Sequence, residues 1–193
     1  MQPVVSSSAM TSVHEWSGHQ HAKRLRQWPL IAHVAERVRD HPDLEALILI
    51  GSFAKHTADE ASDVDLVVAV LEGRFEKAWA DRHLLAPTNS LVAWDIRPDP
   101  EREIASHRFL SRNVVKVEIL LATPSSGFQL ADPTAVVVGE KSVTERFHRI
   151  PAIDAEVLRQ YAEELRAEGV LPEVELCYGN LMRAIRGAIS RWP

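Results

Sequence analysis

The sequence predicts a mixed α/β domain followed by a helical C-terminal region. Two strongly apolar runs, LEALILI at residues 44–50 and VDLVVAV at 64–70, have the length and composition of strands that are covered on both faces. Apolar residues recur at helical spacing over 27–40, and beyond residue 140 the patterns are mainly helical. We therefore expect an α/β (α+β) fold with a mixed sheet of about 4–5 strands, flanked by helices, and a C-terminal helical appendage.

The first elements follow from periodicity and from glycine and proline positions. A helix is expected over 27–40, because Pro29 suits a first helical turn and apolar residues share one face. The strand at 44–50 stops at Gly51-Ser52, and a polar segment leads to the next strand. The following patterns predict a helix over 74–86 and a strand over 91–97.

The second half begins with Pro98 and Pro100, which bracket a turn into a helix expected near 101–110. The patterns after it predict a strand at 114–121, short extended pieces over 127–139, and helices at 142–149, 153–168 and 173–191. The expected organisation is a mobile tail at 1–22, an α/β domain at 23–140 and a helical region at 141–193.

Composition narrows the classes of function. A hydrophobic fraction of 46% is sufficient for a core without a stabilising metal or disulfide, and a single cysteine, Cys177, excludes an internal disulfide. A net charge of −5 argues against binding of long nucleic acids, which favours a basic surface. The sequence shows neither a signal-peptide pattern nor an apolar run long enough to cross a membrane, so a cytoplasmic protein is expected.

Two short motifs, Gly51-Ser52 and Asp63-Val64-Asp65, have residues suited to binding phosphate and a cation. Glycine lets a phosphate approach the backbone, and the serine hydroxyl can donate a hydrogen bond to it. In a strand Asp63 and Asp65 point the same way, about 6.6 Å apart, and two such carboxylates suit a hard cation such as Mg²⁺. Residues 53–62 form too short a connection for parallel strands, so antiparallel pairing should bring the turn and the carboxylates together at one sheet edge.

In these residues the chain resembles the nucleotidyltransferase superfamily, which includes polymerase β-like enzymes, aminoglycoside and lincosamide nucleotidyltransferases and small MNT-type proteins. GSFA at 51–54 and SDVDL at 62–66 match the family pattern of Gly-Ser, a spacer and then two acids on a strand. The likeness is specific over 44–70 and looser to about residue 140. One departure is His56, since relatives often carry a second glycine at this position.

The resemblance implies two Mg²⁺ ions, with Mn²⁺ as a substitute, roughly 4 Å apart, that activate a hydroxyl and neutralise phosphate charge. Asp63 and Asp65 would hold both ions, and Gly51, Ser52 and Lys55 would contact the phosphates of the nucleotide. The family also uses a third acid on a later strand, usually Asp. Glu118 is the favoured candidate and Asp95 the alternative, although Lys116 is spaced to form a structural ion pair with Glu118.

The implied function is transfer of a nucleoside monophosphate from a nucleoside triphosphate to a hydroxyl of a small molecule. ATP is the favoured nucleoside triphosphate. The acidic chain weakly favours a cationic acceptor such as an aminoglycoside-like antibiotic. Two alternatives stay open: an MNT-like antitoxin that modifies a protein partner, and an inactive binding module with this fold. The final helical pattern would pack on the domain, on a second copy of the chain or on a small helical protein.

Overall fold

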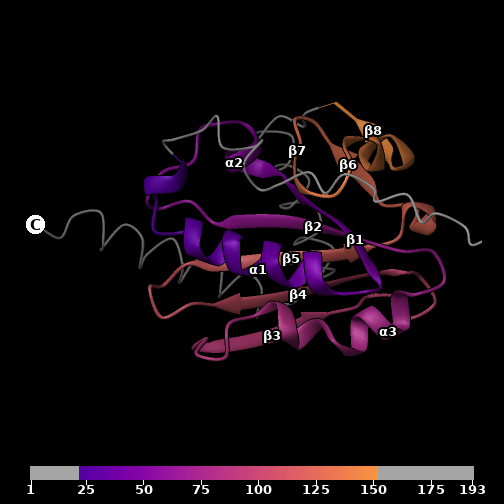
Figure 1. Cartoon of the computed structure of the whole chain (residues 1–193), viewed down its shortest axis with the longest axis horizontal. Helices are drawn as coiled ribbons and strands as arrows, with labels where there is room; N and C mark the ends of the chain where they lie inside the picture. The colour runs from indigo at the N-terminus through magenta and orange to yellow at the C-terminus, as the bar shows by residue number, and fades with distance from the viewer. Residues whose placement is uncertain (1–21, 152–193) are drawn as a thin grey trace, which may run out of the picture. The chain divides into compact units, whose positions relative to one another are not determined.

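The computed structural model describes residues 22–151 (Figure 1). The helices expected over 153–168 and 173–191 lie outside these residues, as does the tail expected at 1–22 except for Ala22, which begins a 3₁₀ helix. The described residues up to Ile150 belong to one compact unit. Among them no helix is long and apolar enough to cross a membrane.

Helices and strands alternate at the start of the described chain, and consecutive strands follow them. Five elements lead from the first helix through the central strands: α1 (Trp28–Asp40), β1 (Leu44–Leu49), the single helical turn α2 (Gly51–Ala54), β2 (Val64–Val70) and α3 (Phe75–Ala80). The remaining strands are β3 (Val92–Ile96), β4 (Ile104–Leu110), β5 (Lys116–Ala122), β6 (Gln129–Ala131), β7 (Ala135–Val138) and β8 (His148–Ile150). Four 3₁₀ helices complete the set: η2 (Ala22–Arg24), η3 (Arg82–Leu85), η4 (Pro124–Ser126) and η5 (Lys141–Arg146).

Within residues 22–151 six strands form one mixed sheet in the order β3-β4-β5-β2-β1-β7. The pairing of β1 with β2 is antiparallel, as expected from their short connection. β2 and β5 run parallel, and the other neighbours in this sheet are antiparallel. β6 and β8 pair separately as a small parallel sheet. The predicted α/β class is confirmed, with one or two strands more than expected.

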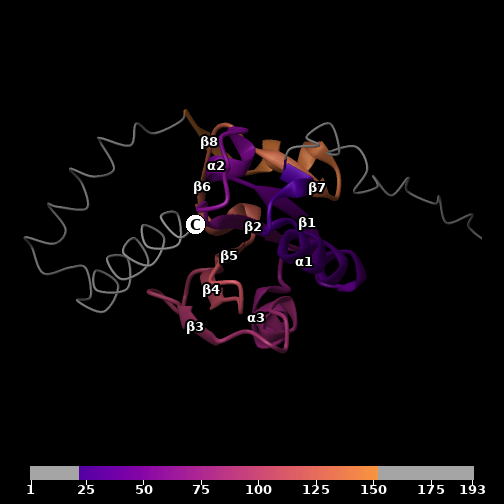
Figure 2. The same ribbon diagram turned by 90° about the vertical axis from the view of Figure 1, so that its left-hand side faces the viewer.

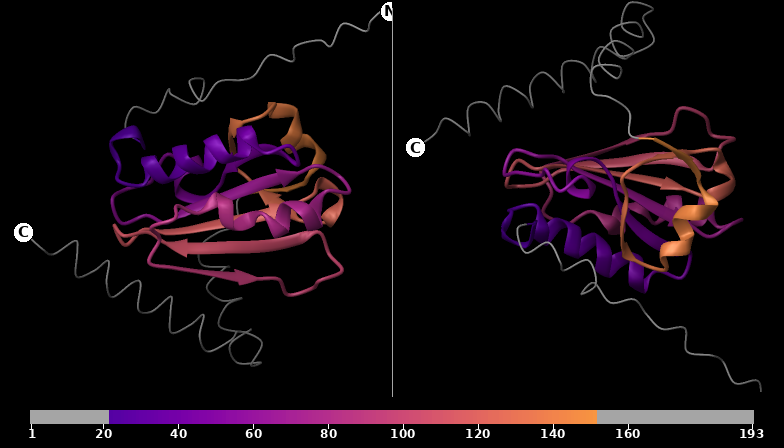
Figure 3. Two further views of the ribbon diagram at one scale, coloured as in Figure 1. Left: turned by 60° about the horizontal axis from the view of Figure 1, so that its bottom comes forward. Right: turned by 90° about the horizontal axis from the view of Figure 1, so that it is seen from above.

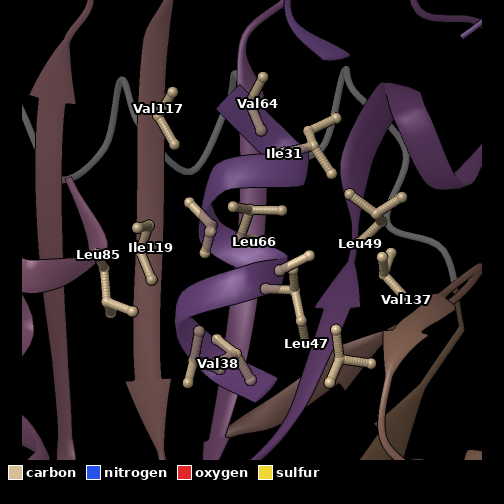
Figure 4. Close-up of a cluster of buried hydrophobic side chains, with 14 of the residues drawn as sticks. Ile31, Val38, Leu47, Leu49, Val64, Leu66, Leu85, Val117, Ile119 and Val137 are labelled. Atoms are coloured by element: carbon tan, nitrogen blue, oxygen red, sulfur yellow. The ribbon is translucent and has the colours of Figure 1, made fainter. Parts of the chain in front are cut away.

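Helix α1 packs against one face of the sheet, and α3 lies on the same side (Figures 2 and 3). The buried residues of α1 recur at helical spacing and interlock with alternate residues of the central strands (Figure 4). The opposite face is covered in part by a smaller cluster that includes Leu130, Val143 and Phe147. Apolar cover on both faces accounts for the strongly apolar sequences of β1 and β2.

Two expected helices are wrong in part or in whole. The helix expected near 101–110 is instead strand β4, which pairs with β3 on one side and β5 on the other. Polar side chains in this segment find partners across the neighbouring strands, and that tertiary pairing overrides the local pattern. The helix expected over 142–149 is only the short 3₁₀ helix η5, followed by β8.

Candidate functional site

The turn after β1 lies directly against the start of β2. Gly51 has a φ of +63°, a conformation that glycine adopts without the steric cost of a Cβ atom. A Cβ atom on Gly51 would lie 2.8 Å from Oδ2 of Asp65, so the position also requires glycine for space. The Ile50 amide donates a hydrogen bond of 3.2 Å to the Asp65 carbonyl oxygen. The structure thus places the Gly-Ser turn and the Asp65 carboxylate in contact.

The other residues predicted to contact phosphate belong to α2 or follow it. Ser52 is the second residue of this four-residue helical turn, and its carbonyl oxygen accepts a 3.0 Å hydrogen bond from the Thr57 amide. Lys55 is exposed and ends the turn, its amide donating to the Gly51 carbonyl oxygen at 3.0 Å. One turn adds little helix dipole, so anion binding here would rest on backbone amides, the hydroxyl and the lysine.

His56 adopts the left-handed conformation, with a φ of +60°. This conformation disfavours residues with a side chain by roughly 1–2 kcal/mol and is free of that cost for glycine. The backbone therefore explains why a glycine suits this position in relatives. It also shows that the turn keeps its conformation with histidine in place.

Asp63 immediately precedes β2 and follows a tightly closed loop. The Asp59 carboxylate accepts hydrogen bonds from the Ser62 hydroxyl at 2.8 Å and the Ala61 amide at 3.0 Å. The hydrogen bond from Ser62 is the main reason that the pKa of Asp59 is lowered. This ionised aspartate closes the loop that leads into Asp63.

Asp65 lies beside Glu118, because β2 and β5 are parallel neighbours and these two residues are in register. Strand alternation puts Asp65 on the same face as Val67, opposite the face covered by α1. Burial raises the pKa of Asp65, and the negative charge of Glu118 raises it further, while Lys116 and Arg108 oppose the shift. The position therefore carries a desolvated carboxylate next to a second one, which favours a bound cation or proton.

Glu118 is held by neighbouring cationic side chains. Arg108 Nη2 donates to Glu118 Oε1 at 2.6 Å from the paired position on β4, and the Ser106 hydroxyl donates to the same oxygen at 3.1 Å. Lys116 Nζ lies 3.6 Å from Glu118 Oε2, so the structural ion pair considered for Lys116 is present. Sequence reasoning did not identify Arg108, since its position beside Glu118 depends on β4 being a strand.

Asp95, the alternative third acid, lies elsewhere in the sheet. It is on β3, and strands β4 and β5 separate β3 from β2. Arg82 and His107 each contact its carboxylate at 2.7 Å. Burial alone would raise the pKa of Asp95, but these hydrogen bonds outweigh it and lower the pKa. The structure brings Glu118, and not Asp95, next to Asp65.

Asp63 and Asp65 have the chemistry that a divalent cation requires. Carboxylate oxygens are the ligands that Mg²⁺ prefers. Asp65 is buried beside the negative charge of Glu118, and a bound cation would neutralise its carboxylate. Across residues 22–151 no three His, Cys, Asp or Glu side chains are grouped closely enough to form a complete metal site. Asp63 and Asp65 would supply the first oxygen donors to a cation, and Glu118 lies beside Asp65 but is paired with Arg108 and Lys116.

A family model for the nucleotidyltransferase domain matches residues 31–126, which include most of α1, the Gly51 turn, β2 and β5. The chain belongs to the polymerase β-like nucleotidyltransferase superfamily. No curated protein is significantly similar to the chain in sequence. The nucleotidyltransferase match shows a domain class that transfers nucleoside monophosphates and uses a nucleotide substrate. The match does not identify the acceptor.

Proposed function

We propose that the chain transfers a nucleoside monophosphate from ATP, or another nucleoside triphosphate, to a hydroxyl group of a small molecule. The observation that carries the proposal is the contact between the Gly51 turn and Asp65, with Glu118 in register on the adjacent strand. A glycine turn against a desolvated carboxylate, with a second carboxylate in register beside it, is an arrangement suited to nucleotide transfer.

In this proposal Asp63 and Asp65 hold divalent cations and Glu118 is the third acid of the site. Mg²⁺, or Mn²⁺ in its place, would neutralise phosphate charge and make the acceptor hydroxyl more acidic. Gly51, Ser52 and Lys55 contact the β- and γ-phosphates through backbone, hydroxyl and ammonium groups. The acceptor oxygen bonds to the α-phosphorus, the bond to pyrophosphate breaks and the hydroxyl proton is released.

The charges next to the site bear on whether the acceptor is cationic or neutral. The acidic net charge favours a cationic, aminoglycoside-like acceptor, but Arg108 and Lys116 balance Glu118 locally. The charge beside Glu118 thus gives a cationic acceptor no particular advantage over a neutral one. An acceptor panel should therefore contain neutral sugars and nucleosides as well as aminoglycosides.

The test is incubation of the full chain with α-labelled ATP, Mg²⁺ and this panel, followed by separation of labelled products. We expect label on a small acceptor, and a loss of at least a thousandfold in an Asp63→Ala, Asp65→Ala double variant. A matched control is the Glu36→Ala, Asp40→Ala variant, which removes two exposed carboxylates of α1 and should keep full activity. Intact activity in the Asp63, Asp65 variant would refute the proposal.

The same assay separates the two alternative functions. Label that appears on a co-expressed small helical protein, with none on the panel, would identify an antitoxin that modifies a protein. Absence of transfer together with absence of MgATP binding in titration calorimetry would identify an inactive module.

A further inference from the structure

The buried residue Gln27 lies outside the matched nucleotidyltransferase segment and contacts the loop before Asp63. Its backbone carbonyl oxygen accepts hydrogen bonds from the amides of Leu30 and Ile31, so the main chain of Gln27 starts α1. Its side chain is fully buried and makes no capping bond to the helix. Glutamine is also not among the favoured residues at a helix start, so capping does not account for it.

The Gln27 side chain instead spans to the loop at 59–62. Nε2 donates to the Asp59 carbonyl oxygen at 2.8 Å and to the Ser62 carbonyl oxygen at 2.9 Å. A primary amide has two N–H donors, and both are used here. Since both contacted atoms are carbonyl oxygens, only the NH₂ end of the amide can face them. Among the described residues Oε1 is buried with no hydrogen-bond partner.

The bond to Ser62 acts directly on Asp63. The Ser62 carbonyl and the Asp63 amide belong to one planar peptide unit, so fixing the carbonyl oxygen also fixes the plane from which Asp63 extends. The Asp59 carboxylate closes the same loop on its exposed side, through the Ser62 hydroxyl. The loop is thus held from inside by Gln27 and from outside by its own aspartate.

A buried amide that leaves one oxygen unsatisfied costs free energy, and an apolar residue of the same size would avoid that cost. We propose that Gln27 is a positioning residue: it orients Asp63 for cation binding by holding the Asp59–Ser62 loop against the start of α1. This inference rests on the proposed function, because it assigns the held carboxylate its role as a cation ligand.

The test is Mn²⁺ binding to the full chain, with the metal alone and free Mn²⁺ measured by electron paramagnetic resonance. Gln27→Met keeps the side-chain size and removes both donors. We expect its affinity for Mn²⁺ to fall by about tenfold to a hundredfold, the usual effect of removing a residue that orients a metal ligand. Circular dichroism checks that the variant is folded. Glu60→Gln is the matched control, since it alters the exposed side of the same loop and should bind within twofold of the wild type.

Gln27→Glu provides a second test that does not depend on Gln27→Met folding. A carboxyl group of this size can donate one hydrogen bond when protonated and none when ionised. Position 27 is fully buried, and full burial raises the pKa of a carboxyl group toward this pH range. The loss of Mn²⁺ affinity, measured against wild type at the same pH, should therefore be larger at pH 8 than at pH 6.

Each result decides the inference. Wild-type affinity in Gln27→Met, an equal loss in Glu60→Gln, or a pH-independent loss in Gln27→Glu would each overturn the role of Gln27 while leaving the proposed function standing. Failure of the wild type itself to bind Mn²⁺ would instead overturn the proposed function and this inference together.

Discussion

The proposed function of Asp65 and the stability of the fold oppose each other at this single residue. Its carboxylate is desolvated, touches the space that a Cβ atom on Gly51 would fill, and lies beside Glu118. The raised pKa means that the folded state resists the ionised form of Asp65. Ionisation costs more in the folded chain than in the unfolded chain, and the cost is present at neutral pH.

Replacing Asp65 with asparagine should therefore stabilise the protein while abolishing transfer. Well below the ordinary aspartate pKa, Asp65 is protonated in both folded and unfolded states, so the variant and the wild type should be equally stable. As pH rises through that value the unfolded state ionises first, and the wild type loses stability relative to the variant. We expect Asp65→Asn to be more stable by about 1 kcal/mol at pH 7, measured by urea unfolding without divalent cations.

The comparison with Asp99→Asn supplies the control, since Asp99 is on the turn between β3 and β4, away from β2. This variant should show no gain that grows with pH. An Asp65→Asn variant less stable than wild type at pH 7 would contradict the proposed cost of ionising Asp65 in the folded chain.

At the scale of strands, β4 and β5 set the charge around the site. Arg108 on β4 and Lys116 on β5 both contact Glu118, and both lower the pKa of Asp65. Removing Arg108 should therefore raise the pKa of Asp65. We expect the acidic limb of the pH–activity profile of Arg108→Met to move to higher pH, because Asp65 must be ionised to bind a cation.

The Arg108→Met variant also loses a hydrogen bond to a charged group, which costs about 1.5–3 kcal/mol of stability. Arg97→Met is the matched control. Arg97 forms an ion pair with Glu76 and lies over the ring of Phe75, so its loss should lower stability without moving the acidic limb. An unshifted profile in Arg108→Met would show that Arg108 does not set the charge state of Asp65.

The strands also show what sequence alone can predict. The bounds expected for β2 match the structure, because an apolar run covered on both faces needs no information beyond its own residues. A helix was expected near 101–110, where β4 lies, since Pro98 and Pro100 bracket a turn and Ser106 and His107 are polar. Both are buried, and their partners Glu118 and Asp95 lie on neighbouring strands, where no local pattern reveals them.

The same distinction holds in the candidate site. The contact between Gly51 and Asp65 was predictable, because a short connection between antiparallel strands leaves few alternatives. The ion pair between Lys116 and Glu118 was expected, but the contacts of Glu118 with Ser106 and Arg108 could not be predicted once β4 was taken as a helix. Gln27 was expected only to begin a helix, and its contacts with Asp59 and Ser62 join segments that are 32 and 35 residues apart in the sequence.

At the scale of the whole folded domain, cation binding and folding should be coupled. The proposed cation site needs β2 paired with its neighbours and the loop before it closed, so the unfolded chain cannot present Asp63 and Asp65 in this way. A ligand that binds only the folded state stabilises it, by about 2.7 kcal/mol at a concentration one hundred times its dissociation constant. Mg²⁺ or Mn²⁺ should therefore raise the thermal unfolding midpoint of the full chain.

The size of this stabilisation should depend on pH in a defined direction. A proton competes with the cation for Asp65, and the raised pKa of Asp65 extends that competition above the usual range for aspartate. At a fixed cation concentration the increase in midpoint should be smaller at pH 5 than at pH 7.5, as measured by differential scanning calorimetry. An Asp63→Asn, Asp65→Asn variant should lose the increase at both pH values. An increase that persists in this variant would place the stabilising cation away from the two aspartates. The role proposed for them as cation ligands would then be wrong.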